Sequence, residues 1–163
     1  MENMTGKVWI LGDDIDTDII IPTEYLAMKT IDDMKQYAFS PLRPELAGQI
    51  QKGDIIVAGK NFGCGSSREQ APEIIKALGI QCVIAKSFAR IFFRNAINNG
   101  LLLIEQPNLY DDIKEGDTIT VHMNKHVDYN GKEYPIAALP ENLMRIIQAG
   151  GLVGAMRKLN ELD

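Results

Sequence analysis

The apolar residues of this chain form short continuous runs of strand length, separated by segments with helical spacing. Such runs are typical of strands that are buried on both faces of a sheet. The expected strands are Lys7–Leu11, Asp54–Ala58, Gln81–Lys86 and Leu101–Glu105. One helical pattern ends at Leu78, and a second is predicted from a Ser87 cap to Asn98. This alternation of strands and helices predicts parallel βαβ units with right-handed crossovers.

The C-terminal third of the chain has a different pattern. Thr118–Met123 alternates apolar and polar residues, and Asn130-Gly131 lies between short β-like segments, which is a hairpin signal. Pro140 is expected to open a helix through Gln148, and a last amphipathic helix should run to about Leu159. Antiparallel strands joined to parallel ones make a mixed sheet, so we expect one α/β domain over residues 1–163.

The N-terminal third is less regular. A helix is predicted from Thr30 toward Tyr37, whereas Pro41–Gly53 is expected to be an irregular surface segment. Asp13–Asp18 is an acidic loop without the glycine and the terminal glutamate of an EF-hand. Capping or active-site use of these carboxylates is therefore favoured over calcium binding.

Composition and charge narrow the classes of function. The chain has 163 residues and a net charge of −5, which argues against a nucleic-acid partner. No apolar run approaches the roughly 20 residues of a membrane span, and Met1–Val8 lacks the apolar core of a signal peptide. We therefore expect a cytoplasmic protein. The two cysteines, Cys64 and Cys82, lack iron–sulfur or zinc spacing, so we expect this chain to bind no cluster and no metal.

The segment Asn61–Pro72 carries the strongest functional signal. Its glycines permit a tight bend and the close approach of a ligand, and two serines and Arg68 follow at once. These groups suit a carboxylate or a phosphate. Two alternatives stay open: Ser66 with Glu69 also matches a capping box, and a phosphate-binding module without catalysis would use the same groups. A dinucleotide site is less well supported, because Arg68 stands where its fingerprint has the third glycine.

The sequence resembles the aconitase superfamily, and within it the small subunits of 3-isopropylmalate dehydratase. Besides the segment from Gly63 to Glu69, the resemblance includes Gly12–Asp18, Ile21-Pro22 with Tyr25-Leu26, and Ala85–Asn95. It covers nearly the whole chain. It implies the swivelling β/β/α domain of aconitases and a hydro-lyase that isomerises a 2-hydroxy diacid by dehydration and rehydration. Small subunits of homoaconitase and of dimethylmalate dehydratase are alternatives in the same superfamily.

The resemblance also implies roles for individual residues. Ser66 would be the general base and Asp18 an acidic catalytic residue, while Ser67 and Arg68 would hold a substrate carboxylate. The loop with Ala27 and Met28 would face the variable end of the substrate. Members that handle a third carboxylate tend to carry arginine at the position of Ala27, so the uncharged residues here favour isopropylmalate over homocitrate.

The same resemblance implies a [4Fe-4S] cluster, for which this chain lacks the ligands. We therefore expect a large partner subunit that carries the cluster, and a chain that is active only with it. A homo-oligomer of the isolated chain is left open.

Two further pairs of residues have functional spacing. Arg90 and Arg94 share a helix face, and contact with solvent or with a partner subunit is the favoured role for both. His122 and His126 have the spacing that binds zinc on a helix, but this segment is predicted to be strand and turn, with no third ligand near.

Overall fold

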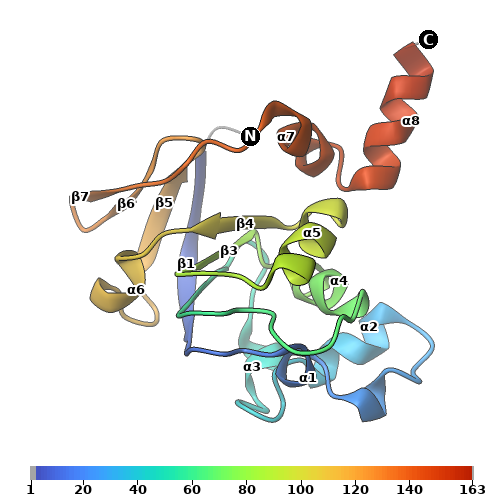
Figure 1. The fold of residues 1–163 in the computed structure, drawn as a ribbon. Helices are drawn as coiled ribbons and strands as arrows, with labels where there is room; N and C mark the ends of the chain where they lie inside the picture. Colours follow the sequence, from blue (N-terminus) through green and yellow to red (C-terminus); the bar gives the residue numbers. More distant parts are fainter. Residues whose placement is uncertain (1–2, 163) are drawn as a thin grey trace.

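A computed structural model of the chain describes residues 3–162. Its centre is a mixed seven-stranded sheet in the order β4-β3-β2-β1-β5-β6-β7, in which β1 to β4 are parallel to one another and β5 to β7 are antiparallel (Figure 1). The strands are β1 (Asn3–Leu11), β2 (Ile55–Ala58), β3 (Cys82–Ala85), β4 (Leu102–Glu105), β5 (Thr118–His122), β6 (His126–Tyr129) and β7 (Lys132–Pro135). The predicted mixed α/β fold with parallel βαβ units is confirmed.

β1 belongs to both halves of the sheet. Its C-terminal part, Val8–Leu11, pairs with β2 in parallel register. Its N-terminal part, Asn3–Lys7, pairs antiparallel with β5. The strand starts earlier than its apolar run because this N-terminal part has one exposed face, so its residues are not continuously apolar.

Helices lie on both sides of the parallel half. The longer ones are α4 (Gln70–Ala77), α5 (Arg90–Asn98), α7 (Glu141–Gln148) and α8 (Leu152–Leu162). The short ones are α1 (Thr17–Ile20), η1 (Thr23–Tyr25), α2 (Ile31–Met34), η2 (Lys35–Tyr37), α3 (Leu46–Gln49) and α6 (Leu109–Asp112). Figure 1 shows α8 projecting away from the sheet at one end of the molecule. Within residues 3–162, no helix is both long and apolar enough to cross a membrane.

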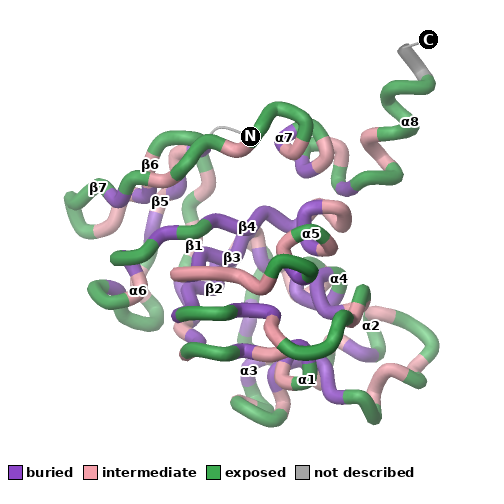
Figure 2. Tube along the Cα trace, in the orientation of Figure 1, coloured by how far each residue is buried: buried purple, intermediate pink, exposed green. Residues whose placement is uncertain are grey.

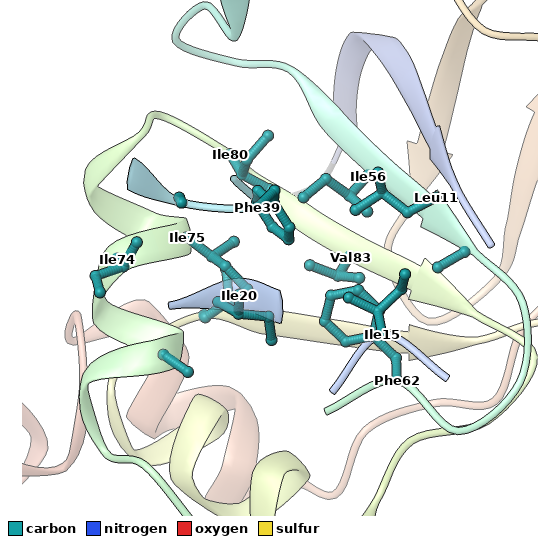
Figure 3. Close-up of a cluster of buried hydrophobic side chains, with 14 of the residues drawn as sticks. Leu11, Ile15, Ile20, Phe39, Ile56, Phe62, Ile74, Ile75, Ile80 and Val83 are labelled. Carbon is teal, nitrogen blue, oxygen red and sulfur yellow. The ribbon is translucent and has the colours of Figure 1, made fainter. Parts of the chain in front are cut away.

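The core lies on both faces of the parallel strands, which are buried in Figure 2. Successive residues of a strand point to opposite faces. Ile56 of β2 therefore packs in a cluster with Phe39 and the α4 residues Ile74 and Ile75, part of which is drawn in Figure 3. Its neighbour Ile55 packs in a second cluster with the antiparallel strands and α7. Continuous apolar strands are the sequence pattern that this two-sided burial requires.

Three local expectations were wrong. Ser87 does not cap α5, which begins at Arg90 after an extended Ala89, because the Ser87 hydroxyl accepts a hydrogen bond from the Asn61 N–H at 2.8 Å. The predicted irregular segment Pro41–Gly53 contains the short helix α3, which buries Leu46. A further short helix, α6, lies between β4 and β5, where no element was expected.

Candidate functional site

Three loops meet where the parallel strands β1, β2 and β3 end. The Gly63 N–H donates to the Ile15 carbonyl at 2.7 Å, and the Thr17 N–H donates to the Cys64 carbonyl at 2.9 Å. The loop after β3 is joined in the same way, since the Phe62 N–H donates to the Ser87 carbonyl at 3.0 Å. The carboxyl ends of parallel strands are where open α/β sheets bind ligands. The acidic loop and the segment Asn61–Pro72 therefore form one surface at such an edge.

The bend in Asn61–Pro72 depends on its glycines. Gly63 and Gly65 have φ angles of 84° and 91°, a region that residues with a side chain rarely adopt. A side chain at position 63 would also collide with the Phe92 ring. The bend is then closed by the buried Thr17, whose hydroxyl donates to the Ser66 carbonyl at 2.6 Å.

The structure does not show the capping box that Ser66 and Glu69 would form. Helix α4 begins at Gln70, and Glu69 occupies the cap position without a capping side-chain bond. Pro72 is then the third helical residue, in the first turn, where its missing N–H is tolerated. The Ser66 backbone is used to close the bend, and its hydroxyl has no hydrogen-bond partner among the described residues. Ser66 as a whole is an exposed residue.

Arg68 links the bend to the acidic loop. Both N–H groups of Nη1 are used, one to Asp18 Oδ1 at 3.1 Å and one to the Ile21 carbonyl at 2.6 Å. Nη2 donates to the Thr23 hydroxyl at 2.7 Å. The side chain is 14% exposed and so is fixed in direction. Nε makes no hydrogen bond among the described residues, and Arg68 contributes to the lining of the hollow described below.

Asp18 lies at the start of α1 with its side chain 65% exposed. Its contact with Arg68 places the predicted acid beside the predicted carboxylate clamp. The capping use expected of carboxylates in the acidic loop is confirmed for Asp16, whose carboxylate caps α1 by accepting from the Ile19 N–H at 2.8 Å.

A hollow of about 210 Å³ opens beside the bend, and Ser67, Arg68, Arg90, Ile91 and Asn95 contribute to its lining. Complete small-molecule sites usually measure about 300–1,000 Å³, so this hollow has the size of a partial site. Asn95 Nδ2 donates to the Ser67 hydroxyl at 3.4 Å. Ser66 and Asp18 lie outside the lining, on the exposed surface around it.

The first turns of α5 contribute residues that sequence reasoning did not assign to the site. Arg90 and Asn95 line the hollow, and neither Arg90 nor Arg94 has a carboxylate within 4.0 Å in the part of the chain that is described. Ile91 is 60% exposed, which is high for a large apolar residue. The signal available in the sequence was the position of this helix directly after a parallel strand.

The loop with Ala27 and Met28 is packed rather than free. Tyr25 stacks on Tyr37 with ring centroids 4.1 Å apart. Met28 packs against the apolar core, whereas Ala27 is exposed. Of the two predicted specificity residues, Ala27 is thus the one whose side chain is free to meet another molecule. Arg68 fixes the start of this loop through Thr23.

The cysteines have the properties of structural residues. Partial burial, reinforced by the nearby Asp16 and Asp14, raises the pKa of the Cys64 thiol. Complete burial on β3 raises the pKa of Cys82 to about 12. Thiols that stay protonated are poor nucleophiles and poor metal ligands. Neither fits the ligation of an iron–sulfur cluster.

One expectation about His122 and His126 is corrected. The segment is strand and turn as predicted, but a third group is near: Asp128 lies within hydrogen-bond distance of both imidazoles. The two histidines face each other across β5 and β6, a pairing that sequence spacing alone does not reveal.

Comparisons with known proteins give a consistent picture. The model of the aconitase C-terminal domain matches residues 15–109. The chain is 76% identical to a 3-isopropylmalate dehydratase small subunit from Lachnospira eligens, over 99% of each chain. It is 52% identical to a 3-isopropylmalate dehydratase small subunit 1 from Archaeoglobus fulgidus, over 96% of this chain and 98% of that one. A crystal structure of 3-isopropylmalate dehydratase from Methanocaldococcus jannaschii superimposes with a TM-score of 0.92 at 39% identity, covering 98% of this chain and 96% of the other.

Proposed function

This chain belongs to the family of 3-isopropylmalate dehydratase small subunits, within the aconitase C-terminal domain family, and from that premise we propose the role of each site residue. The reaction is the interconversion of 2-isopropylmalate and 3-isopropylmalate in leucine biosynthesis, by loss and re-addition of water. In the proposal, this chain supplies a serine base, a carboxylate clamp and a specificity loop to an active site that is completed by a large subunit.

The observation that carries the proposal is the arrangement around Arg68. The guanidinium is held by three protein contacts and lines the hollow, so its positive charge is fixed where a substrate carboxylate can bind. The Ser67 hydroxyl, oriented by Asn95, lies next to it in sequence and lines the same hollow. A carboxylate bound there presents its neighbouring carbon to the exposed surface on which Ser66 lies.

Ser66 takes a proton from that carbon. The C–H electrons form the carbon–carbon double bond, and the hydroxyl on the adjacent carbon takes a proton from an acid of the completed site and leaves as water. Water then adds back with the opposite orientation: its hydroxyl bonds to the first carbon, its proton returns to the acid, and Ser66 gives its proton to the adjacent carbon. A serine hydroxyl is a weak base and needs positive charge or N–H donors to hold the proton-free form. In the described residues no such donor contacts the Ser66 hydroxyl, so the proposal requires the partner subunit and the bound substrate to complete its surroundings.

The size of the hollow and the exposed groups around it support a partner subunit. A partial cavity, the exposed Ile91, and the cationic Arg90 and Arg94, which form no ion pair with the described residues, make a surface suited to be covered by another chain. Because neither cysteine here fits a cluster, the proposal places any [4Fe-4S] cluster in the large subunit, where it would supply Lewis-acid chemistry.

Reconstitution tests this function. We expect the purified chain to be colourless and without dehydratase activity, and co-purification with a large subunit of the same family to give a brown complex that converts 2-isopropylmalate. Assays with homocitrate-type and dimethylmalate-type diacids in the same complex distinguish the alternative substrates. Visible iron–sulfur absorbance and turnover in the single chain would contradict the two-subunit proposal.

A binding experiment separates this function from a phosphate-binding module. The thermal unfolding of the single chain is measured with inorganic phosphate, nucleotides and isopropylmalate. Stabilisation by phosphate or nucleotides that is lost in Arg68→Lys, together with an inactive complex, would favour the module. Activity in the complex with no effect of phosphate on the single chain is the expected result.

A further inference from the structure

A second polar cluster lies in the antiparallel half of the sheet. His122 on β5 and His126 on β6 are direct partners in the strand register, and their ring centroids are 4.7 Å apart. Asp128 is two residues beyond His126 on β6, so it points to the same face of the sheet. The three side chains are half-buried, and their ligand atoms all lie within 4.8 Å of one another.

The atoms of the cluster converge on one point. His122 Nε2 is 2.6 Å from Asp128 Oδ2, and His126 Nε2 is 3.0 Å from Asp128 Oδ1. Both imidazoles therefore present the same ring nitrogen to one carboxylate. An ion held by these donors would replace both contacts with bonds of roughly 2.0–2.2 Å.

The opposite side of one imidazole is also arranged as metal sites require. His122 Nδ1 lies 3.0 Å from the Asn3 side-chain oxygen on β1. With Nδ1–H donating to this oxygen, Nε2 is the nitrogen that can give its lone pair to an ion, which would replace the present hydrogen bond between Nε2 and Asp128. Metal-binding histidines almost always have their other nitrogen held by a carbonyl or carboxylate in this way.

A further oxygen is available beside these groups. Glu133 on β7 is the register partner of Asp128, and its Oε1 lies 3.9 Å from His126 Nε2. The side chain is 71% exposed and free to turn toward the cluster. It can bind an ion directly or hold a water in the fourth position of a tetrahedral site.

We propose that His122, His126 and Asp128 form a binding site for a divalent transition-metal ion of the zinc type. Two imidazole nitrogens and one carboxylate oxygen suit zinc, nickel or copper, and do not suit calcium or magnesium, which prefer oxygen ligands alone. The partial exposure of the three side chains, 27%, 23% and 43%, leaves an entry path for the ion.

The site is remote from the proposed active site. His122 pairs with Asn3 at the start of β1, whereas the acidic loop follows Leu11 at its end. At about 3.3 Å per residue these ends are separated by about 26 Å. An ion there joins β5 to β6 and, through Asn3, is tied to β1, so its role is to fasten strands and not to take part in dehydration.

Titration calorimetry tests the proposal directly. The metal-free, untagged chain is titrated with zinc chloride, and we expect saturable binding of one ion per chain. Asp128→Asn keeps the size of the side chain and removes the anionic ligand. Since changing even an outer partner of a metal ligand costs about 10–100-fold in affinity, loss of the ligand itself should weaken binding by about 100-fold or more. His126→Gln should weaken zinc binding to the same extent, and this variant tests the proposal if Asp128→Asn fails to fold.

Two control variants make the result specific. Asp32→Asn removes an exposed carboxylate on α2, and Cys64→Ser removes the partly exposed thiol; both should bind zinc as the unaltered chain does. With cobalt in place of zinc, the unaltered chain should show the intense visible bands of four-coordinate Co²⁺. Asp128→Asn and His126→Gln should not show them. Absence of saturable zinc binding, equal affinity in Asp128→Asn and His126→Gln, or loss of binding in Cys64→Ser would overturn the proposal.

Discussion

At the scale of the residue, the adjacent residues Ser66, Ser67 and Arg68 of the bend have different structural roles. The Ser66 backbone closes the bend through Thr17, whereas its hydroxyl forms no hydrogen bond with the described residues. Ser67 is oriented by Asn95, and Arg68 is fixed by the acidic loop. The effect on activity of removing the Ser66 or the Ser67 hydroxyl can therefore be measured separately from any effect on the fold.

Ser66→Ala is expected to fold, to assemble with the large subunit and to lose turnover by about 10²–10⁴-fold, as for a general base. Its kcat is measured in the reconstituted complex, and its melting temperature in the single chain. Ser67→Ala is the matched control: it should mainly raise KM, because it removes a binding group. A lower melting temperature with unchanged kcat in Ser66→Ala would show a structural role instead.

Asp54 provides a residue-scale test of the core. This buried carboxylate accepts from Trp9 Nε1 at 2.8 Å and from the Gln51 N–H at 2.8 Å. Asp54→Ala leaves the buried Trp9 Nε1–H unpaired, at about 1–3 kcal/mol, so we expect a loss of about 1–3 kcal/mol of unfolding free energy. Urea unfolding followed by the fluorescence of Trp9, the only tryptophan, measures it. A change within about 0.5 kcal/mol, as expected for the exposed Asp32→Ala, would contradict this.

At the scale of the element, the sequence predicted what local pattern determines. The buried parallel strands and the Asn130-Gly131 hairpin followed from apolar runs and from turn chemistry; both turn residues have positive φ, at 52° and 82°. Features set by contacts distant in sequence were missed. Ser87 has the chemistry of a helix cap, yet its hydroxyl binds Asn61 in another loop. Likewise, Asp128 meets His122 only because of the strand register.

The loop with Ala27 and Met28, which follows η1, leads to a prediction about substrate specificity. Ala27 is exposed on a segment that is held by the stacked Tyr25 and Tyr37. In the assembled enzyme, Ala27→Arg should sharply lower the ratio of kcat/KM for isopropylmalate to that for homocitrate-type substrates, because it supplies a partner for a third carboxylate and disfavours the isopropyl group. Ala27→Ser, which adds no charge, is the control. An unchanged ratio would show that this loop does not contact the substrate.

At the scale of the whole molecule, the segment between β4 and β5 crosses from the parallel half to the antiparallel half. Its carboxylates fasten it at several points. Asp112 accepts from the Tyr134 hydroxyl, and Asp117 from the Tyr129 hydroxyl, each at 2.6 Å. Glu115 binds Arg43 at 2.6 Å and accepts from the Ile10 N–H of β1 at 3.1 Å.

These contacts predict sensitivity to acid. The hydrogen bonds from Arg43, Tyr134 and Tyr129 lower the pKa values of Glu115, Asp112 and Asp117. A carboxyl group with a lowered folded-state pKa contributes stability above its unfolded pKa, about 4, and this stability is lost as pH falls through the folded value. The urea midpoint should therefore fall between pH 5 and pH 2. Tyr129→Phe should reduce the fall, while the exposed Asp32→Asn should not; equal acid dependence in all three proteins would contradict the argument.

The double pairing of β1 has a consequence for synthesis of the chain on the ribosome. Asn3–Leu11 emerges before its antiparallel partner, Thr118–His122, which is translated more than a hundred residues later. Translation at about 5–20 residues per second makes this an interval of about 5 to 20 seconds. During that time the first strand can pair with β2 along one part only, and its other part remains an uncovered edge, open to pairing with another nascent chain. The exposed residues of Asn3–Lys7, including a lysine, give that waiting edge a polar and partly charged character, which disfavours such pairing.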